Sequence, residues 1–291
     1  MRIIVPASSA NLGPGFDSIG MAVNCYLTLT VGPSSDEWQV NHNLGDLPHD
    51  QSNMIVQTAL KVDAGLKPHQ LAIESDVPLA HGLGSSATAV VAGVELANQL
   101  GHLKLTDDDK IELASQVEGH PDNAAPAILG GIVVGTNLGG HFAAVKAPHF
   151  PYDLAAYIPH YNLKTADARA ALPKQLPYSQ AIHGSAIANS LVAALFAKRY
   201  ELVGPLLEAD KFHEQYRAKL VPELMKIRYI GHQTGALATY LSGAGPTVMT
   251  LLKADKLPTF KAALQSAGLH DSLWELAIDD DGVRVEGALQ P

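Results

Sequence analysis

Apolar and polar residues recur along the chain in two periods, one typical of strands and one of helices. Runs that alternate or are continuously apolar predict strands over 2–6, 26–31, 71–75, 132–134, 154–158 and 248–252, with 38–40 as a partner of 26–31. Helical spacing predicts helices from Asn53 onward, over 90–100, over 106–117, and over 162–173, 184–199, 201–220 and 258–267. The chain therefore combines both kinds of element.

Turn residues indicate how these elements connect. Gly139-Gly140 followed by 142–145 predicts one hairpin, and Asp281-Gly282 between 273–278 and 283–286 predicts another, with the acidic run 279–281 as a solvated tip. Pro148 and Pro151 precede a new strand. We therefore expect a boundary near residue 150, with one domain over 1–150 and a second over 151–291.

Composition narrows the function classes. The 291 residues are 47% apolar and 17% charged, which suits a folded globular protein. The net charge of −9 argues against general nucleic-acid binding, which needs a basic surface. The single cysteine, Cys25, excludes an intrachain disulfide and is expected to be buried. The first residues lack the features of a signal peptide and no run is long enough to span a membrane, so we expect a cytoplasmic enzyme.

The segment VPLAHGLGSSAT, residues 77–88, joins a predicted strand to a predicted helix. Glycines permit close approach of a ligand to the backbone, and a helix start offers free N–H groups and partial positive charge. This combination favours an anion site, most simply for a phosphate chain. The segment has neither the Gly-Lys pair of a P-loop nor the third glycine of a dinucleotide fingerprint. The alternative is a glycine turn before a capped helix.

The pattern P-x-A-x-G-L-G-S-S-A-T in this segment resembles the phosphate loop of the GHMP kinases, a family of small-molecule kinases. The resemblance implies that ATP is bound by the loop residues Pro78, Leu79, Ala80, His81, Gly82, Leu83, Gly84, Ser85, Ser86, Ala87 and Thr88. It also implies a contact of Asn53 with adenine, although Asn53 is equally a helix N-cap. Many members of the family carry a basic residue where this chain has His81. A histidine side chain is only partly charged near neutral pH.

The segment ASSANLGPGFD, residues 7–17, resembles the N-terminal signature of the homoserine kinase branch of this family. By that resemblance Asn11 and Asp17 contact an amino-acid substrate, and a carboxylate such as Asp17 suits an ammonium group. The alternative is a surface loop between two strands.

A third segment, ELASQVEGHPDN, also resembles this branch. The resemblance implies that a Glu eleven residues before the Asn, here Glu112 before Asn123, binds Mg²⁺ together with the hydroxyl of Ser86. Glu118 is the competing candidate, and an exposed helix Glu is the structural alternative. One carboxylate, one hydroxyl and nucleotide phosphates form a usual ligand set for this ion.

The HPDN motif places polar side chains before a small-residue apolar run. The resemblance puts His120 and Asn123 beside the substrate. Mevalonate kinase has a catalytic Asp near this place, whereas Asn123 carries an amide that cannot act as a base. Either Asp122 serves as the base or the reaction proceeds without a strong one, and a purely structural turn is the alternative.

The second half of the chain contributes further candidates by the same resemblance. Thr165 and Arg169 are expected to contact substrate and phosphate, Arg217 to grip a substrate carboxylate through its planar fork, and Gly243, in YLSGAGPT, to form a glycine turn at the active site. A solvated helix arginine and an ordinary turn are the alternatives.

Together the resemblances imply an α+β protein with the two-domain GHMP kinase fold. Its first domain has a mixed sheet with helices and a left-handed βαβ element, and its second is a ferredoxin-like α/β sandwich. The implied reaction is ATP-dependent phosphorylation of the L-homoserine side-chain hydroxyl, a step in threonine biosynthesis, with Asn123, Asp122 and Arg169 at the reaction centre. The expected partners are ATP, Mg²⁺ and L-homoserine, with a homodimer as the expected assembly. Another GHMP kinase, acting on mevalonate or a sugar, and a non-catalytic nucleotide-binding homologue are the alternatives.

Overall fold

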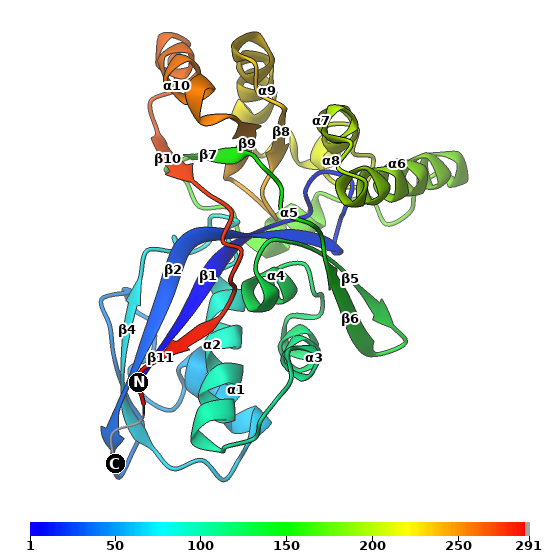
Figure 1. Ribbon diagram of the computed structural model, residues 1–291. Coiled ribbons are helices and arrows are strands. Elements are labelled where there is room, and N and C mark those ends of the chain that lie inside the picture. Colours follow the sequence, from blue (N-terminus) through cyan, green and yellow to red (C-terminus); the bar gives the residue numbers. More distant parts are fainter. Residues whose placement is uncertain (289–291) are drawn as a thin grey trace.

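The computed structural model describes residues 1–288 and contains two β-sheets, each with helices packed against it (Figure 1). The larger sheet and its helices lie in the lower part of Figure 1, and the smaller sheet with its helices lies above it. The α+β class expected from the sequence is confirmed.

The larger sheet is mixed. Its strands are β1 (Arg2–Ala10), β2 (Ile19–Ser34), β3 (Gln39–Asn41), β4 (His69–Ser75), β5 (Ile132–Leu138), β6 (His141–Lys146) and β11 (Arg284–Glu286). The main path runs β11-β1-β2-β4-β3, and β5 pairs with both β2 and β6. The β3–β4 pair is parallel and the others are antiparallel. The expected hairpin at Gly139-Gly140 is thus confirmed, whereas the expected pairing of 38–40 with 26–31 is wrong.

Helices pack on this sheet through one apolar core. They are α1 (Met54–Val62), α2 (Ser85–Leu100), α3 (Asp107–Glu118) and α4 (Ala124–Leu129). The core joins strand residues such as Ile3 and Leu29 to helix residues such as Val90 and Ile111, all at most 1% exposed. Side-chain caps fix two helix starts: Asn53 accepts from Ile55 N, and Thr106 forms a capping box with Asp109.

The smaller sheet is wholly antiparallel, with the order β10-β7-β9-β8. Its strands are β7 (Asp153–Ile158), β8 (Ala238–Leu241), β9 (Val248–Leu252) and β10 (Ser272–Leu276). The helices of this half are α5 (Thr165–Ala170), α6 (Tyr178–Phe196), α7 (Tyr200–Leu207), α8 (Glu214–Arg217), α9 (Glu223–Thr234) and α10 (Leu257–Ser266), with a 3-10 turn at Ala254–Lys256. Counted along the chain, the strand order is fourth, first, third, second, which is the ferredoxin-like arrangement expected from the resemblance.

Alternate residues of β7 face different cores. Ala155 and Tyr157 pack with α9 and α10, whereas Leu154 and Ala156 belong to a core that also contains Met21 of β2. Because this second core contains residues from both sheets, the two halves are joined by buried apolar surface rather than by a bare linker. Cys25 lies in it, 4% exposed, and burial raises its thiol pKa to about 12.

The C-terminal segment crosses from one sheet to the other. β10 pairs with β7 and β11 pairs with β1, so the hairpin expected over 273–286 is wrong. Asp279 is not a solvated tip, since it is 6% exposed and accepts hydrogen bonds from Tyr26 Oη and from the N–H groups of Asp281 and Gly282. We therefore propose a domain division near residue 150 in which residues 277–286 return to the first domain.

Two further boundaries differ from the sequence expectations. β1 continues to Ala10 and β2 begins at Ile19, so the segment 7–17 starts within a strand and only the turn after Ala10 matches the surface-loop alternative. The helix expected over 201–220 is interrupted, because Asp210 accepts from the N–H groups of Phe212, His213 and Glu214 and starts the separate helix α8. Within residues 1–288, no helix has both the length and the apolarity that crossing a bilayer requires.

Candidate active site

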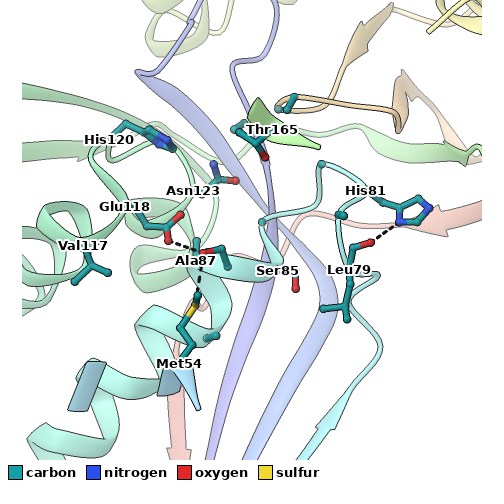
Figure 2. Close-up of a pocket in the computed structure, with 18 of the residues that line it drawn as sticks. Met54, Leu79, His81, Ser85, Ala87, Val117, Glu118, His120, Asn123 and Thr165 are labelled. Atoms are coloured by element: carbon teal, nitrogen blue, oxygen red, sulfur yellow. Dashed lines mark hydrogen bonds between the residues drawn. The ribbon is translucent and has the colours of Figure 1, made fainter. Parts of the chain in front are cut away.

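A cleft of about 980 Å³ collects residues from both halves of the chain. It is lined by most of the residues that the sequence singled out: Asn11, Asp17, Asn53, Leu79, Ala80, His81, Gly82, Gly84, Ser85, Ser86, Ala87, Glu118, His120, Asp122, Asn123, Thr165, Arg169, Arg217 and Gly243. Four candidates do not line it: Pro78, Leu83, Thr88 and Glu112. Figure 2 shows Glu118, His120 and Asn123 on one side of this space, with Ser85, Leu79 and His81 on the other.

The phosphate loop has the backbone conformation that its glycines permit. Gly82 and Gly84 have φ values of 78° and 68°. A Cβ at Gly84 would lie 2.2 Å from Ser8 Oγ, and one at Gly82 would lie 2.4 Å from the Ser242 carbonyl oxygen. Both positions therefore require glycine for its conformation and for its size.

Free donors surround the start of α2. Gly84 is its N-cap, and within residues 1–288 the N–H groups of Gly84, Ser85, Ser86 and Ala87 have no hydrogen-bond acceptor. These are the donors that a helix leaves unpaired at its start, and they border the cleft. The geometry suits a bound anion.

One end of the cleft is apolar. It is lined by Leu47, Met54, Leu79 and Val117, and each of these residues is 38–48% exposed. Asn53 lies there too, but its side chain accepts from Ile55 N and donates to the Pro48 carbonyl. The cap interpretation of Asn53 is therefore confirmed, and the contact with adenine stays a prediction. The sequence analysis did not predict this apolar wall. The signal for it was the presence of apolar residues such as Leu47 within the largely polar segment 41–53.

The acidic partner of Ser86 is Glu118. The Ser86 hydroxyl donates to Glu118 Oε1 at 2.8 Å, and burial raises the pKa of the Glu118 carboxyl (Figure 2). Glu112 instead accepts from the Phe142 N–H at 2.6 Å and tethers α3 to β6. The expectation that Glu112 lies beside Ser86 is thus corrected: Glu112 points to the hairpin because it lies nearly two turns earlier on α3.

The HPDN residues form a linked polar group at the start of α4. His120 Nδ1 and Asp122 Oδ1 lie 2.5 Å apart, and this hydrogen bond raises the pKa of His120. Asn123 donates to the same Asp122 oxygen, and its own Oδ1 accepts from the Ser8 hydroxyl at 3.0 Å. The amide of Asn123 is therefore held between α4 and β1, beside Gly84 of the phosphate loop.

The turn between β1 and β2 is strained and carries charge into the cleft. Asn11, Leu12 and Asp17 have φ values of 74°, 42° and 54°, in the left-handed region that side chains disfavour. The Asn11 amide holds the turn together, since it accepts from Asp17 N and donates to the Gly243 carbonyl. Strain maintained by such bonds is typical of functional loops.

Two arginines flank this turn. Arg169 donates to both Asp17 oxygens, at 3.0 and 3.2 Å, and both side chains are partly exposed. Arg217 is 2% exposed, and burial together with the nearby charge of Arg169 lowers its pKa to about 10. Phe16 lies between them, with its ring centroid 5.7 Å from Arg169 Cζ and 5.3 Å from Arg217 Cζ. Sequence reasoning missed Phe16, although it sits inside the motif that identified its neighbours.

The ring of His81 contacts the backbone of its own loop in this structure. Its Nδ1 lies 2.7 Å from the Leu79 carbonyl oxygen, which fixes the ring locally. Figure 2 shows the ring directed away from Ser85 and Glu118.

Comparison with known proteins agrees with this arrangement. Residues 53–131 match the family model "GHMP kinases N terminal domain", and residues 191–270 match "GHMP kinases C terminal". A curated homoserine kinase from Limosilactobacillus fermentum is 62% identical over 98% of this chain and 100% of its own length. The chain belongs to the homoserine kinase family. Within this family, the crystal structure of homoserine kinase from Cytophaga hutchinsonii has a TM-score of 0.85 at 26% identity, covering 98% of this chain and 96% of that one.

A solved structure of a putative homoserine kinase from Listeria monocytogenes is closer in sequence, at 42% identity with a TM-score of 0.88 over 98% of this chain and 99% of that one. The two-domain GHMP kinase fold of the homoserine kinase family is therefore this chain's fold. Family membership also explains why the cleft collects the glycine loop, the HPDN motif and the two arginines in one place.

Proposed function

We propose that this chain transfers the γ-phosphoryl group of ATP to the side-chain hydroxyl of L-homoserine, giving ADP and O-phospho-L-homoserine. The observation that carries the proposal is 62% identity to a homoserine kinase over nearly the full length of both chains. The cleft supports it, because an anion site at the start of α2 lies in the same space as residues suited to a small zwitterion.

ATP would occupy the phosphate loop and the apolar end of the cleft. The unpaired N–H groups from Gly84 to Ala87 suit its phosphates, and Leu47, Leu79 and Met54 suit its base. The whole segment from Pro78 to Thr88 shapes this part of the site. Leu83 and Thr88 do not line the cleft, but their side chains are fully buried and support the segment from the protein interior.

Ser86 and Glu118 would hold Mg²⁺. Their oxygens are already 2.8 Å apart, and a carboxylate with a hydroxyl is a donor set that suits this ion. Burial disfavours a negative charge on Glu118 in the free protein, so a cation at this place would stabilise the ionised carboxylate. The bound ion would neutralise phosphate charge during transfer.

Homoserine would bind between the β1–β2 turn and the arginines. Asp17 suits its ammonium, while Arg169 and Arg217 suit its carboxylate, and Asn11, Thr165 and Gly243 shape the walls. Asp17 and Arg169 form a salt bridge at partly exposed positions, so the cleft already contains one negative and one positive group for the two charges of a zwitterion.

The acceptor hydroxyl would be positioned by His120 and Asn123. Asp122 accepts hydrogen bonds from both of these neighbours through Oδ1, so this oxygen is already engaged in holding the motif together. Phosphoryl transfer depends mainly on alignment and charge stabilisation, so we assign Asn123, Asp122 and Arg169 to positioning rather than to proton abstraction.

A panel of acceptors tests the proposed function. With ATP and Mg²⁺, the purified chain should release ADP rapidly with L-homoserine and far more slowly with mevalonate or galactose. Faster turnover of mevalonate or of a sugar would assign a different GHMP kinase activity. If no acceptor leads to ADP release, the chain would be assigned a non-catalytic nucleotide-binding role.

The proposal includes a cytoplasmic homodimer. ATP is available in the cytoplasm, and α6 exposes large apolar side chains, Tyr178 at 83% and Ile182 at 55%. Exposed apolar residues on one helix favour a protein contact. Light scattering of the purified chain should give twice the mass of 30.7 kDa, and a mass of one chain would remove the dimer from the proposal.

A further inference from the structure

The guanidinium of Arg217 is held on two of its three nitrogen atoms. Nε donates to the Ala168 carbonyl at 3.2 Å, and Nη1 donates to the Gly243 carbonyl at 3.0 Å. Nη1 also lies 3.2 Å from His213 Nδ1. In the part of the chain that the structure describes, Nη2 has no hydrogen-bond partner, and Arg217 lines the cleft. The group is therefore oriented before any ligand binds, with one nitrogen left for it.

His213 connects this guanidinium to the β1–β2 turn. Its side chain is fully buried, and its Nε2 lies 2.9 Å from the Gly13 carbonyl oxygen. A carbonyl only accepts and a guanidinium only donates, so the imidazole carries its hydrogen on Nε2 and accepts from Arg217 at Nδ1. This assignment gives a neutral ring with both nitrogens used.

The ring of Phe16 reinforces the connection. It stacks on His213 with centroids 5.4 Å apart and planes at 27°, and Arg217 Cζ lies 5.3 Å from its centroid. Gly13 and Phe16 belong to the same turn as Asp17, so the imidazole contacts this turn through both a hydrogen bond and a stack. A Cβ at Gly13 would lie 1.9 Å from the Leu207 carbonyl oxygen, so the turn approaches α7 closely.

We propose that His213 is a positioning residue for the acceptor site. Its imidazole orients Arg217 so that Nη2 faces the cleft, and it fixes the separation between this arginine and the turn that carries Asp17. The proposal rests on the proposed function, since a substrate with separated positive and negative groups is what such spacing selects. His213 itself contacts no substrate.

Two substitutions separate the two hydrogen bonds of His213. A glutamine amide reaches toward the Nε2 position and an asparagine amide toward the Nδ1 position, so His213→Gln keeps the bond to Gly13 and His213→Asn keeps an acceptor for Arg217. Loss of one hydrogen bond to a charged group predicts that His213→Gln raises the KM for homoserine about tenfold or more. The KM for ATP should stay within about twofold, and His213→Asn should retain most of the homoserine affinity.

A double-mutant cycle tests whether the effect passes through Arg217. In an Arg217→Leu background, adding His213→Gln should leave homoserine affinity unchanged, with binding measured by calorimetry if turnover is too slow. Equal losses for homoserine and ATP, or a second full loss in that background, would assign His213 a merely structural role and overturn the proposal. Thermal unfolding of each variant shows whether it folds.

A readout independent of activity separates this proposal from the proposed function. The ¹⁵N signals of the His213 imidazole, assigned by their loss in the variants, should show a hydrogen on Nε2 and a bare Nδ1. A hydrogen on Nδ1 would overturn the positioning proposal even if homoserine is phosphorylated. Failure of wild-type protein to phosphorylate homoserine would reject the proposed function, whatever the ¹⁵N signals show.

Discussion

At the scale of single residues, spacing along the chain did not show which glutamate of α3 lies beside Ser86. Glu112 and Glu118 lie on one helix and differ by six positions, yet only Glu118 contacts Ser86. The difference arises because six positions are nearly two turns of α3, so Glu118 lies at the helix end beside Ser86 whereas Glu112 lies beside Phe142 of β6. The residue types needed at the site were predictable from the sequence, whereas the choice between two similar carboxylates required the position of the helix end.

Glu118→Gln should lower kcat by about 100-fold or more, because it removes the carboxylate that we assign to Mg²⁺. The loss should be partly recovered at high Mg²⁺ concentration. Measurement of kcat against Mg²⁺ concentration checks this expectation.

Glu112→Gln is the matched control on the same helix. It should leave kcat and its Mg²⁺ dependence near wild type, while weakening the bond to Phe142 N and costing about 1 kcal/mol of unfolding free energy. A wild-type Mg²⁺ response in Glu118→Gln, with a shifted response in Glu112→Gln, would reverse the assignment.

At the scale of elements, the strand–loop–helix unit around Gly84 was predictable because its signals are local. Glycines, serines and helical spacing all occur within 71–101, and the structure places β4 and α2 there. The pairing of 38–40 and the hairpin over 273–286 were predicted wrongly, because a strand's partner depends on contacts between distant segments. The interruption between α7 and α8 was missed because it depends on one carboxylate, Asp210, which accepts from successive backbone N–H groups where the second helix begins.

Gly84→Ala should disrupt the phosphate loop. The added Cβ would meet Ser8 Oγ and would also sit at a φ of 68°, so we expect an ATP KM about tenfold higher and a loss of about 2 kcal/mol in unfolding free energy. Steady-state kinetics and urea unfolding measure the two effects.

Gly268→Ala separates the conformational cost from the steric one. Gly268 has a φ of 78°, and among residues 1–288, its two chain neighbours aside, no heavy atom lies within 4 Å of the place that an added methyl group would occupy, so only the left-handed penalty of about 1 kcal/mol applies. Its ATP KM should equal that of wild type. An ATP KM for Gly84→Ala no higher than that of Gly268→Ala would argue against phosphate binding by this loop.

For the whole molecule, the two sheets are connected by a shared apolar core and by the C-terminal segment that crosses between them. The sequence resemblance predicted two domains and the strand order of the second, since those follow from the family fold. It did not predict that the chain returns to the first sheet at β11, because the residues of a short strand do not specify which strand it pairs with. The buried carboxylate of Asp279, with its bonds to Tyr26 and Arg284, fixes that return.

Asp279→Ala should therefore lower the unfolding free energy by about 2 to 3 kcal/mol, since several hydrogen bonds to one buried carboxylate are lost. Homoserine and ATP KM values should be unchanged, because the segment lies outside the cleft. Asp280→Ala is the control: its carboxylate is 44% exposed and pairs with His149, so the cost should stay below about 1 kcal/mol. Equal costs for the two variants in urea unfolding would contradict this role of Asp279.

The central claim is that donors at the start of α2 hold the ATP phosphates while the β1–β2 turn and the arginines hold homoserine in the same cleft. A crystal structure with Mg²⁺, a non-hydrolysable ATP analogue and L-homoserine tests it most directly. We predict phosphates on the N–H groups from Gly84 to Ala87, Mg²⁺ on Ser86 and Glu118, and homoserine between Asp17 and Arg217. Phosphates bound away from residues 82–87, or homoserine bound outside the cleft, would contradict it.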